Sequence, residues 1–216
     1  MNINDEENKV LDKIIENRRT IRAFKKEIPT KAMIEAIIHA GLWAPYAKMA
    51  ITRVKDFRRF FVIQNGNPML NRISDLIQQQ ATVTLEHLEK SFIKNSSLKE
   101  KGKNYFNIVK GLTAKGYPDL PDYPCLIIIA EQRGIPQAEK QSLAHVVQNM
   151  WLKASALGLG LRLMSVIEIL TEDKDFSGLL GLNFGDYAFT GCIVGFSSIE
   201  PERGERPFEE DVITWL

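Results

Sequence analysis

The 216-residue sequence has few of the features that mark membrane, secreted or metal-binding proteins. It has two cysteines, Cys125 and Cys192, both in apolar runs, so we expect buried thiols in a reducing compartment and no disulfide framework. No apolar run approaches the ~20 residues that a membrane-spanning helix needs. The first seven residues are polar and acidic, unlike a signal peptide. We therefore expect a cytoplasmic protein with no membrane partner.

The charges are nearly balanced, with 28 Lys and Arg against 27 Asp and Glu. A net charge of +1 argues against a general polyanion binder, so no nucleic-acid partner is expected. The alternative is a protein that binds nucleic acid or another anion through the basic stretch at residues 48–59. Hydrophobic residues make up 44% of the chain, which is typical of a globular protein, and the length fits one domain over residues 1–216.

The spacing of apolar residues predicts helices mixed with strands. Helices outnumber strands, which indicates an α+β fold with a sheet covered by helices. The expected helices are at 5–17, 30–44, 67–93 and 137–157, with a short helix capped by Thr171, and the expected strands are at 59–63, 123–130, 161–166 and 186–196.

Residues 94–118 form a separate feature. They are polar, rich in lysine and interrupted by glycine, with some helix expected around residues 105–112. Stretches of this length without strong periodicity are usually functional or disordered. A mobile insertion or lid is one hypothesis, and a solvated surface excursion is the other.

Residues 18–24 combine cationic side chains with an apolar anchor. Ile21 and Phe24 are expected to hold this run against a core. Arginine offers a planar, permanently charged group that matches phosphate oxygens, so the run suits a fixed anion such as a phosphomonoester. A solvated helix end, where arginine complements the helix dipole, is the alternative. The polar members of the run are Arg18, Arg19, Thr20 and Arg22.

Other motifs do not indicate a different chemistry. Gly158-Leu159-Gly160 follows a helix and lacks the third glycine of a dinucleotide-binding loop. No Ser-His-Asp order or nucleophile elbow is present, so no catalytic side chain is assigned. The three histidines have no metal-ligand spacing, and structural or surface roles are favoured for His39, His87 and His145.

Four stretches together suggest a family. Their order and spacing resemble the FMN-dependent nitroreductase family over nearly the whole chain, and the family also closes with a basic, proline-containing segment like residues 203–212. The stretches are Arg18-Arg19-Thr20-Ile21-Arg22-Ala23-Phe24, Ala40-Gly41-Leu42-Trp43-Ala44-Pro45-Tyr46, the run from Gln148-Asn149-Met150 to Gly158-Leu159-Gly160, and Val194-Gly195-Phe196.

The resemblance implies a nitroreductase-like fold, with a central, mainly antiparallel sheet covered by helices. It implies an intertwined homodimer with two FMN sites at the subunit interface, and residues 197–216 would pack on the partner subunit. NAD(P)H would reduce the flavin, and a nitroaromatic, quinone or similar electron-poor aromatic acceptor would reoxidise it. A flavin-binding or sensing family member with little NAD(P)H turnover is the alternative.

The resemblance also implies cofactor contacts. Arg22 would reach the pyrimidine edge of the flavin, where a cation stabilises the anionic reduced form. The tail would supply a further phosphate contact, Arg206, with Arg203 as the alternative. The phosphate would be bound by Arg18, Arg19 and Thr20, and the remaining contacts would come from Pro45, Tyr46, Ala47, Lys48, Ser165 and Val166.

The sequence departs from the family pattern at three places. Met49 and Ile51 occupy the positions of an asparagine near the flavin and of a glutamine. Ser165-Val166 replaces a Gly-Gly pair whose backbone faces the reactive flavin nitrogen, and Val166 is expected to crowd the ring. Residues 94–118 match no family motif. These departures leave open whether turnover is retained.

Overall fold

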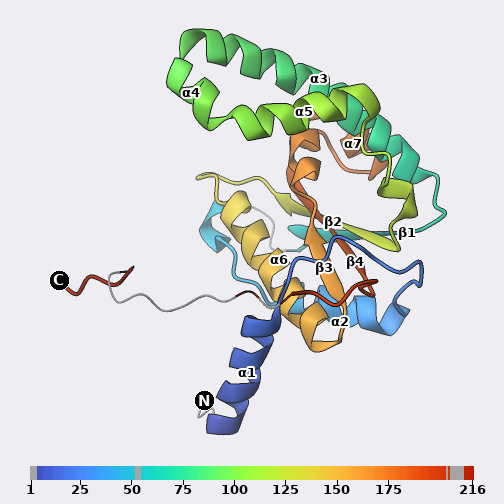
Figure 1. The fold of residues 1–216 in the computed structure, drawn as a ribbon, viewed down its shortest axis with the longest axis vertical. Coiled ribbons are helices and arrows are strands. Elements are labelled where there is room, and N and C mark those ends of the chain that lie inside the picture. The colour runs from blue at the N-terminus through green and yellow to red at the C-terminus, as the bar shows by residue number, and fades with distance from the viewer. Residues whose placement is uncertain (1–3, 52–54, 203, 205–211) are drawn as a thin grey trace.

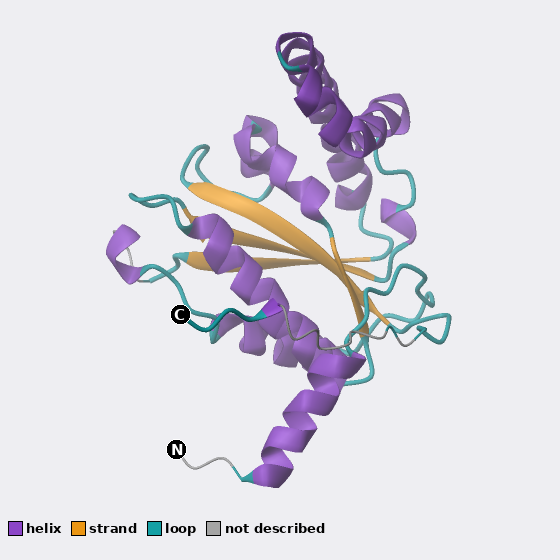
Figure 2. Cartoon of the chain, turned by 60° about the vertical axis from the view of Figure 1, so that its left-hand side comes forward, coloured by secondary structure: helices purple, strands orange, loops and turns teal. Residues whose placement is uncertain are grey.

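The computed structural model describes residues 4–51, 55–202, 204 and 212–216. In this part of the chain, helices cover both faces of a four-stranded sheet (Figures 1 and 2). The strand order is β1-β2-β4-β3, and each neighbouring pair is antiparallel. The predicted α+β class with a mainly antiparallel sheet is confirmed. The strands are β1 (Arg58–Gln64), β2 (Cys125–Gln132), β3 (Gly160–Leu163) and β4 (Tyr187–Gly195).

Helices α2 (Lys31–Leu42) and α6 (Glu139–Ala156) cover one face of the sheet. They pack closely because α2 carries Gly41 at the contact, where a Cβ would lie 2.9 Å from Met150 Cγ. Strand β2 is buried along its whole length, which explains its continuous apolar sequence. Its Ile127 belongs to the core on this face.

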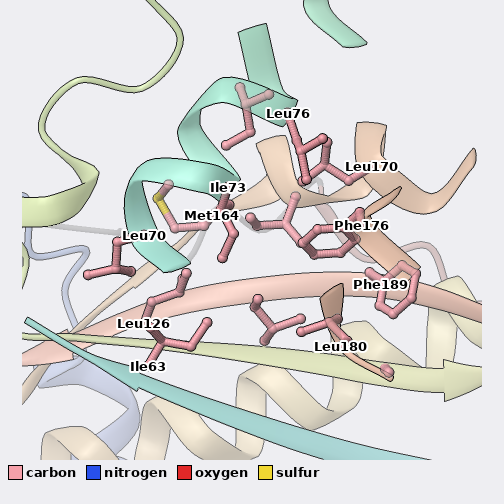
Figure 3. Close-up of a cluster of buried hydrophobic side chains, with 14 of the residues drawn as sticks. Ile63, Leu70, Ile73, Leu76, Leu126, Met164, Leu170, Phe176, Leu180 and Phe189 are labelled. Atoms are coloured by element: carbon pink, nitrogen blue, oxygen red, sulfur yellow. The ribbon is translucent and has the colours of Figure 1, made fainter. Parts of the chain in front are cut away.

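The opposite face is covered by α3 (Met69–Lys94), the 3₁₀ helix η3 (Ser165–Glu172) and α7 (Lys174–Leu179). Figure 3 shows side chains of α3 above the strands of the sheet. The rings of Phe176 and Phe189 meet edge-to-face with their centroids 5.1 Å apart. We call this cluster the α3-side core.

Helices α3, α4 (Ser96–Lys101) and α5 (Lys103–Lys115) form an arm at one end of the molecule (Figure 1). The predicted helix near residues 105–112 is confirmed, but more of residues 94–118 is helical than the sequence indicated. The Asn95 side chain accepts from the amide of Leu98 at 3.1 Å and so starts α4. Phe92 and Phe106 then join α3 to α5, with ring centroids 5.6 Å apart.

Helix α1 (Asp5–Asn17) matches the predicted bounds and extends away from the sheet (Figure 1). It begins with a capping box, in which Asn4 and Glu7 exchange hydrogen bonds. None of its residues is buried. Its apolar stripe, which includes Val10, Leu11 and Ile15, is therefore exposed.

Two predictions for the region after α6 are wrong. The strand expected at 161–166 ends at Leu163, and η3 follows because Ile167 and Leu170 turn into the α3-side core. Thr171 does not cap the next helix. Its hydroxyl accepts from the amide of Phe189, and Asp173 caps α7 instead by accepting from the amide of Phe176 at 2.8 Å.

Both cysteines lie in the core between the sheet and α6, so their predicted burial is confirmed. Burial raises the pKa of the Cys125 thiol to about 12, and burial raises the pKa of Cys192 as well. The thiols therefore stay protonated and unreactive at neutral pH. No helix in the described residues has the length and apolar character to cross a membrane.

Candidate functional site

The arginine-rich run at residues 18–24 lies against the open edge of β3. Thr20 forms a parallel bridge with Leu161, and the amide of Ile21 donates to the Leu161 carbonyl at 3.3 Å. Ile21 is buried over Gly160, where a Cβ would lie 2.5 Å from Ile21 Cγ1. Glycine is therefore needed at this close approach. The predicted anchoring by Ile21 is confirmed.

The far end of the run is held by the segment that follows β4. Phe24 forms an antiparallel bridge with Ser197, and the Phe24 ring meets Tyr123 edge-to-face at 5.9 Å. Phe24 also packs against the α3-side core. The second predicted anchor is thus confirmed, and the backbone between the two anchors has a fixed position.

Two of the arginines lie beside Trp151, near the C-terminal end of α6. The guanidinium carbon of Arg18 lies 4.6 Å from the centre of the Trp151 ring, a cation–π contact. The indole Nε1 of Trp151 donates to the carbonyl of Arg19 at 3.0 Å. Arg22 is exposed. Trp151 therefore fixes the start of the run.

The Arg19 guanidinium is surrounded by backbone carbonyls. Its Nε donates to Glu202 at 3.1 Å, and its Nη2 donates to Gly204 at 3.4 Å. Its Nη1 donates to the carbonyls of Glu16 and Arg18, at 2.5 and 2.9 Å. These acceptors are neutral, and within the described residues no carboxylate forms an ion pair with Arg19. These bonds use four of the five N–H donors, so Arg19 can offer an anion its positive charge and the remaining N–H of Nη2.

Arg203 and Arg206, the predicted tail contacts, lie outside the described residues. The described neighbours Glu202 and Gly204 both accept hydrogen bonds from Arg19. The tail therefore reaches the arginine run at these two residues.

A cavity of about 430 Å³ lies between the N-terminal half of α6, the first half of β4 and η3. In the described part of the chain, β3 pairs with residues 192–195 of β4, and residues 188–190 have no strand partner on that side. The volume of this cavity is in the range of about 300–1,000 Å³ found for small-molecule sites. The walls are formed by Arg133, Gln137, Glu139, Lys140, Leu143, Ala144, Val147, Leu163, Glu168, Thr171, Glu172, Ala188, Phe189 and Thr190.

Two elements connect the cavity to the arginine run. On α6, Val147 lines the cavity and Trp151 lies one turn further along the same face, about 6 Å away. On β3, Leu163 lines the cavity about 7 Å beyond Leu161, the bridge partner of Thr20. We call this arrangement the α6–β3 site, with residues 18–22 and Trp151 at one end and the cavity at the other.

Ser165 and Val166 begin η3, directly after Met164. Ser165 is exposed, whereas the side chain of Val166 packs against the α3-side core. Neither residue is among the cavity-lining residues that the structure describes. The Val166 side chain is held against the α3-side core, and its crowding of a flavin ring stays a prediction.

Residues 45–48 lie beside the other half of α6. The Ser142 hydroxyl donates to the carbonyl of Pro45 at 3.2 Å, and the Tyr46 ring lies 4.2 Å from that of Phe57. Ala47 is half-buried and Lys48 is exposed at the start of a short 3₁₀ helix, η1 (Lys48–Ala50). Ser142 and Trp151 are nine residues apart on α6, about 13 Å. Within one chain, residues 45–48 therefore do not lie beside the arginine run.

Arg58 holds this second region in place. Its buried side chain lies at the start of β1 and donates from Nε to Glu131 at 2.7 Å. Its Nη1 donates to the carbonyls of Gly41 and Ala44, at 3.1 and 3.2 Å, and its Nη2 donates to the Ser142 hydroxyl at 2.9 Å. One cation thus joins β1, β2, α6 and the end of α2. In the sequence Arg58 is one of several cations in the basic stretch at residues 48–59, and this buried role was not predicted.

Comparisons with known proteins agree with this architecture. The sequence profile described as the Nitroreductase family matches residues 15–196. No curated protein matched the sequence. The chain also resembles solved structures at low sequence identity over nearly their whole length. At such identity the likeness supports the fold alone.

A nitroreductase with bound FMN from Bacteroides fragilis is 17% identical, with a TM-score of 0.62, and the match covers 99% of this chain and 100% of that one. A nitroreductase with bound FMN from Desulfitobacterium hafniense is 19% identical, with a TM-score of 0.59, over 95% and 97% of the two chains. A BluB-like flavoprotein from Clostridium difficile is 18% identical, with a TM-score of 0.68, over 95% and 98%.

Proposed function

Because this chain belongs to the nitroreductase family, we propose that it is an FMN-dependent oxidoreductase. It takes hydride from NAD(P)H and passes reducing equivalents to an electron-poor acceptor such as a nitroaromatic or a quinone. The observation that carries the proposal is the α6–β3 site. Trp151 contacts the arginine run one helical turn from Val147, which lines a cavity of small-molecule size. No described carboxylate forms an ion pair with Arg19 in this run.

The described residues fit the two ends of FMN. Arg18, Arg19 and Thr20 offer permanent positive charge and a hydroxyl to the phosphate, as guanidinium groups prefer. The cavity wall is mixed, and its apolar part, which includes Leu143 and Val147, would suit a flat aromatic ring. Bound FMN would supply the hydride chemistry, and the protein residues would position it.

The remaining cofactor contacts are proposals from the resemblance. Arg22 would act at the pyrimidine edge, and the backbone at Ser165 and Val166 would face the ring. A tail arginine, Arg206 or Arg203, would add a phosphate contact.

The separation of the two candidate regions supports a homodimer as part of the proposal. Residues 45–48 and the arginine run lie at opposite parts of α6, so a partner related by a two-fold axis would place one beside the other. The exposed stripe of α1 and the exposed Trp43 offer apolar surface for such an interface. In this arrangement the segment 197–216, which contacts its own chain at Ser197, Glu202 and Gly204, would continue onto the partner subunit. Pro45 to Lys48 would complete the partner's FMN site.

Anaerobic titration tests the proposed activity. The FMN-loaded protein should lose its visible flavin absorbance on addition of NADH or NADPH and regain it when a quinone or nitroaromatic is added. The matched comparison is free FMN at the same concentration. Flavin bands that persist, or that bleach no faster than those of free FMN, would contradict a reductase. That result would favour a flavin-binding member with little turnover.

A further inference from the structure

The far end of the arm combines lysine side chains with exposed apolar ones. We call residues 93–105 the arm tip; they run from the end of α3 through α4 into the first turn of α5. Helix α4 packs on α3 and α5. Figures 1 and 2 show the arm at one end of the molecule, away from the sheet. A partner can therefore reach the tip from outside the molecule.

The outer part of the arm is strongly basic. Residues 90–115 carry seven lysines and one acidic residue, Glu100, whereas Glu86 and Glu89 come earlier on α3. The lysines are all exposed, and none of them forms an ion pair with a carboxylate of the described residues. The whole chain has a net charge of +1, so the remaining residues are net negative. An excess of positive charge is thus concentrated on the arm, where it attracts an anionic surface. The lysines are Lys90, Lys94, Lys99, Lys101, Lys103, Lys110 and Lys115.

Apolar side chains are exposed among the lysines of the tip. Ile93 is 87% exposed, and Leu98 and Tyr105 are exposed as well. Apolar side chains beside lysines are typical of surfaces that bind a membrane, because the apolar groups enter the interface while the lysines meet anionic headgroups. Tyrosine is also enriched where a membrane meets water. Both kinds of side chain in the tip therefore suit the same partner.

The kind of cation distinguishes a membrane from other anionic partners. Residues 90–115 contain no arginine. Arginine is enriched in protein–protein interfaces, where lysine is depleted, and it is the preferred residue for phosphate and nucleic-acid recognition. Lysine is a strongly hydrated point charge on a flexible stem, and it needs no fixed geometry. A set of lysines without arginine therefore favours a diffuse anionic surface, such as a bilayer that contains acidic lipids.

We propose that the arm tip binds the surface of membranes that contain anionic lipids. Its lysines lie at the headgroups, and its exposed apolar side chains enter the interface. Surface binding needs no spanning helix, so the expectation of no membrane partner, which rested on spanning segments, does not bear on it. The proposal goes beyond the proposed function and requires no bound FMN. It would bring the protein to lipid-soluble acceptors such as quinones.

Flotation of the full chain with vesicles tests the proposal. The vesicles contain phosphatidylcholine alone, or phosphatidylcholine with about one third phosphatidylserine. One variant removes the charge of the four tip lysines: Lys94→Gln, Lys99→Gln, Lys101→Gln and Lys103→Gln. A matched variant makes the same change of net charge outside the arm: Lys25→Gln, Lys26→Gln, Lys55→Gln and Lys174→Gln. Every substituted side chain is exposed, so both variants should keep the fold.

The wild-type protein should bind vesicles that contain phosphatidylserine and not those of phosphatidylcholine alone, and added salt should weaken the binding. The four tip substitutions should lower the partition coefficient about tenfold or more, and the matched substitutions should lower it less than about threefold. Ile93→Ser should lower it severalfold, because an apolar group no longer enters the interface. Val83→Ser should leave it unchanged, since this exposed residue lies about 15 Å from Ile93 along the same helix.

Two results overturn the proposal. One is a wild-type protein that does not bind the phosphatidylserine vesicles at low salt, and the same holds if it binds polyglutamate or duplex DNA in their place. The other is equal loss in the two lysine variants, which would show that net charge alone causes the binding. Neither result involves FMN, so each leaves the proposed oxidoreductase intact. A protein that binds the vesicles but never FMN would defeat the oxidoreductase and keep the membrane site.

Discussion

Replacing Arg58 with methionine should lower the free energy of unfolding by about 3–5 kcal/mol, because it leaves the buried Glu131 carboxylate without its partner. The side chains of Arg58 and Glu131 are 0% and 3% exposed, so water cannot replace the lost contact. The carbonyls of Gly41 and Ala44 also lose their donor. Urea unfolding followed by circular dichroism measures the change.

The neighbouring Arg59 offers a matched control for this prediction. It is exposed, and its main contact is a cation–π contact with Phe61 at 5.6 Å. Arg59→Met should therefore cost about 1 kcal/mol or less. The double variant Arg58→Met with Glu131→Leu should regain part of the loss, because it removes the orphaned charge as well. Equal stability of the two single arginine variants would show that the buried network contributes little.

The second large effect is expected at the candidate phosphate site. Arg19→Met should weaken FMN binding by about 10- to 100-fold, since a charge-assisted hydrogen bond to phosphate is lost. Riboflavin lacks the phosphate, so its affinity should stay the same. Fluorescence titration of both ligands, at two salt concentrations, measures the ratio. The difference between FMN and riboflavin should also shrink at high salt in the wild type.

Lys25 serves as the control for charge near the run. It is exposed, and its backbone amide donates to the Phe196 carbonyl at 2.8 Å, a bond that a side-chain change leaves in place. Lys25→Met should leave both affinities within about twofold. If Arg19→Met weakens FMN and riboflavin equally, Arg19 acts through the packing of residues 202 and 204 and does not bind phosphate.

Local sequence patterns were sufficient for most of the secondary structure. The helical period, and for α2 the capping residue Thr30, act within one turn, so α1 and α2 could be placed closely. The continuous apolar run at residues 123–130 is typical of a strand buried on both faces, and β2 is buried along its whole length. The end of β3 could not be predicted, because an apolar stretch fits a strand or a helical turn, and tertiary contacts of Ile167 decide between them.

Only part of the candidate site could be predicted from the sequence. The run at 18–24 is contiguous, so its charge and its anchors could be recognised together. Arg58 and Glu131 are 73 positions apart, and only the pairing of β1 with β2 brings them into contact. Glu139 had no distinguishing sequence signal, because an acidic residue is ordinary in the first turn of a helix. Its place in the cavity wall becomes apparent only in the folded chain.

Native mass spectrometry after incubation with FMN tests the proposed cofactor and assembly most directly. A homodimer that retains two FMN molecules, and that loses them when Arg19 is replaced by methionine, is the predicted result. A protein that retains no FMN in any oligomeric state, even with excess cofactor, would contradict the assignment of the α6–β3 site.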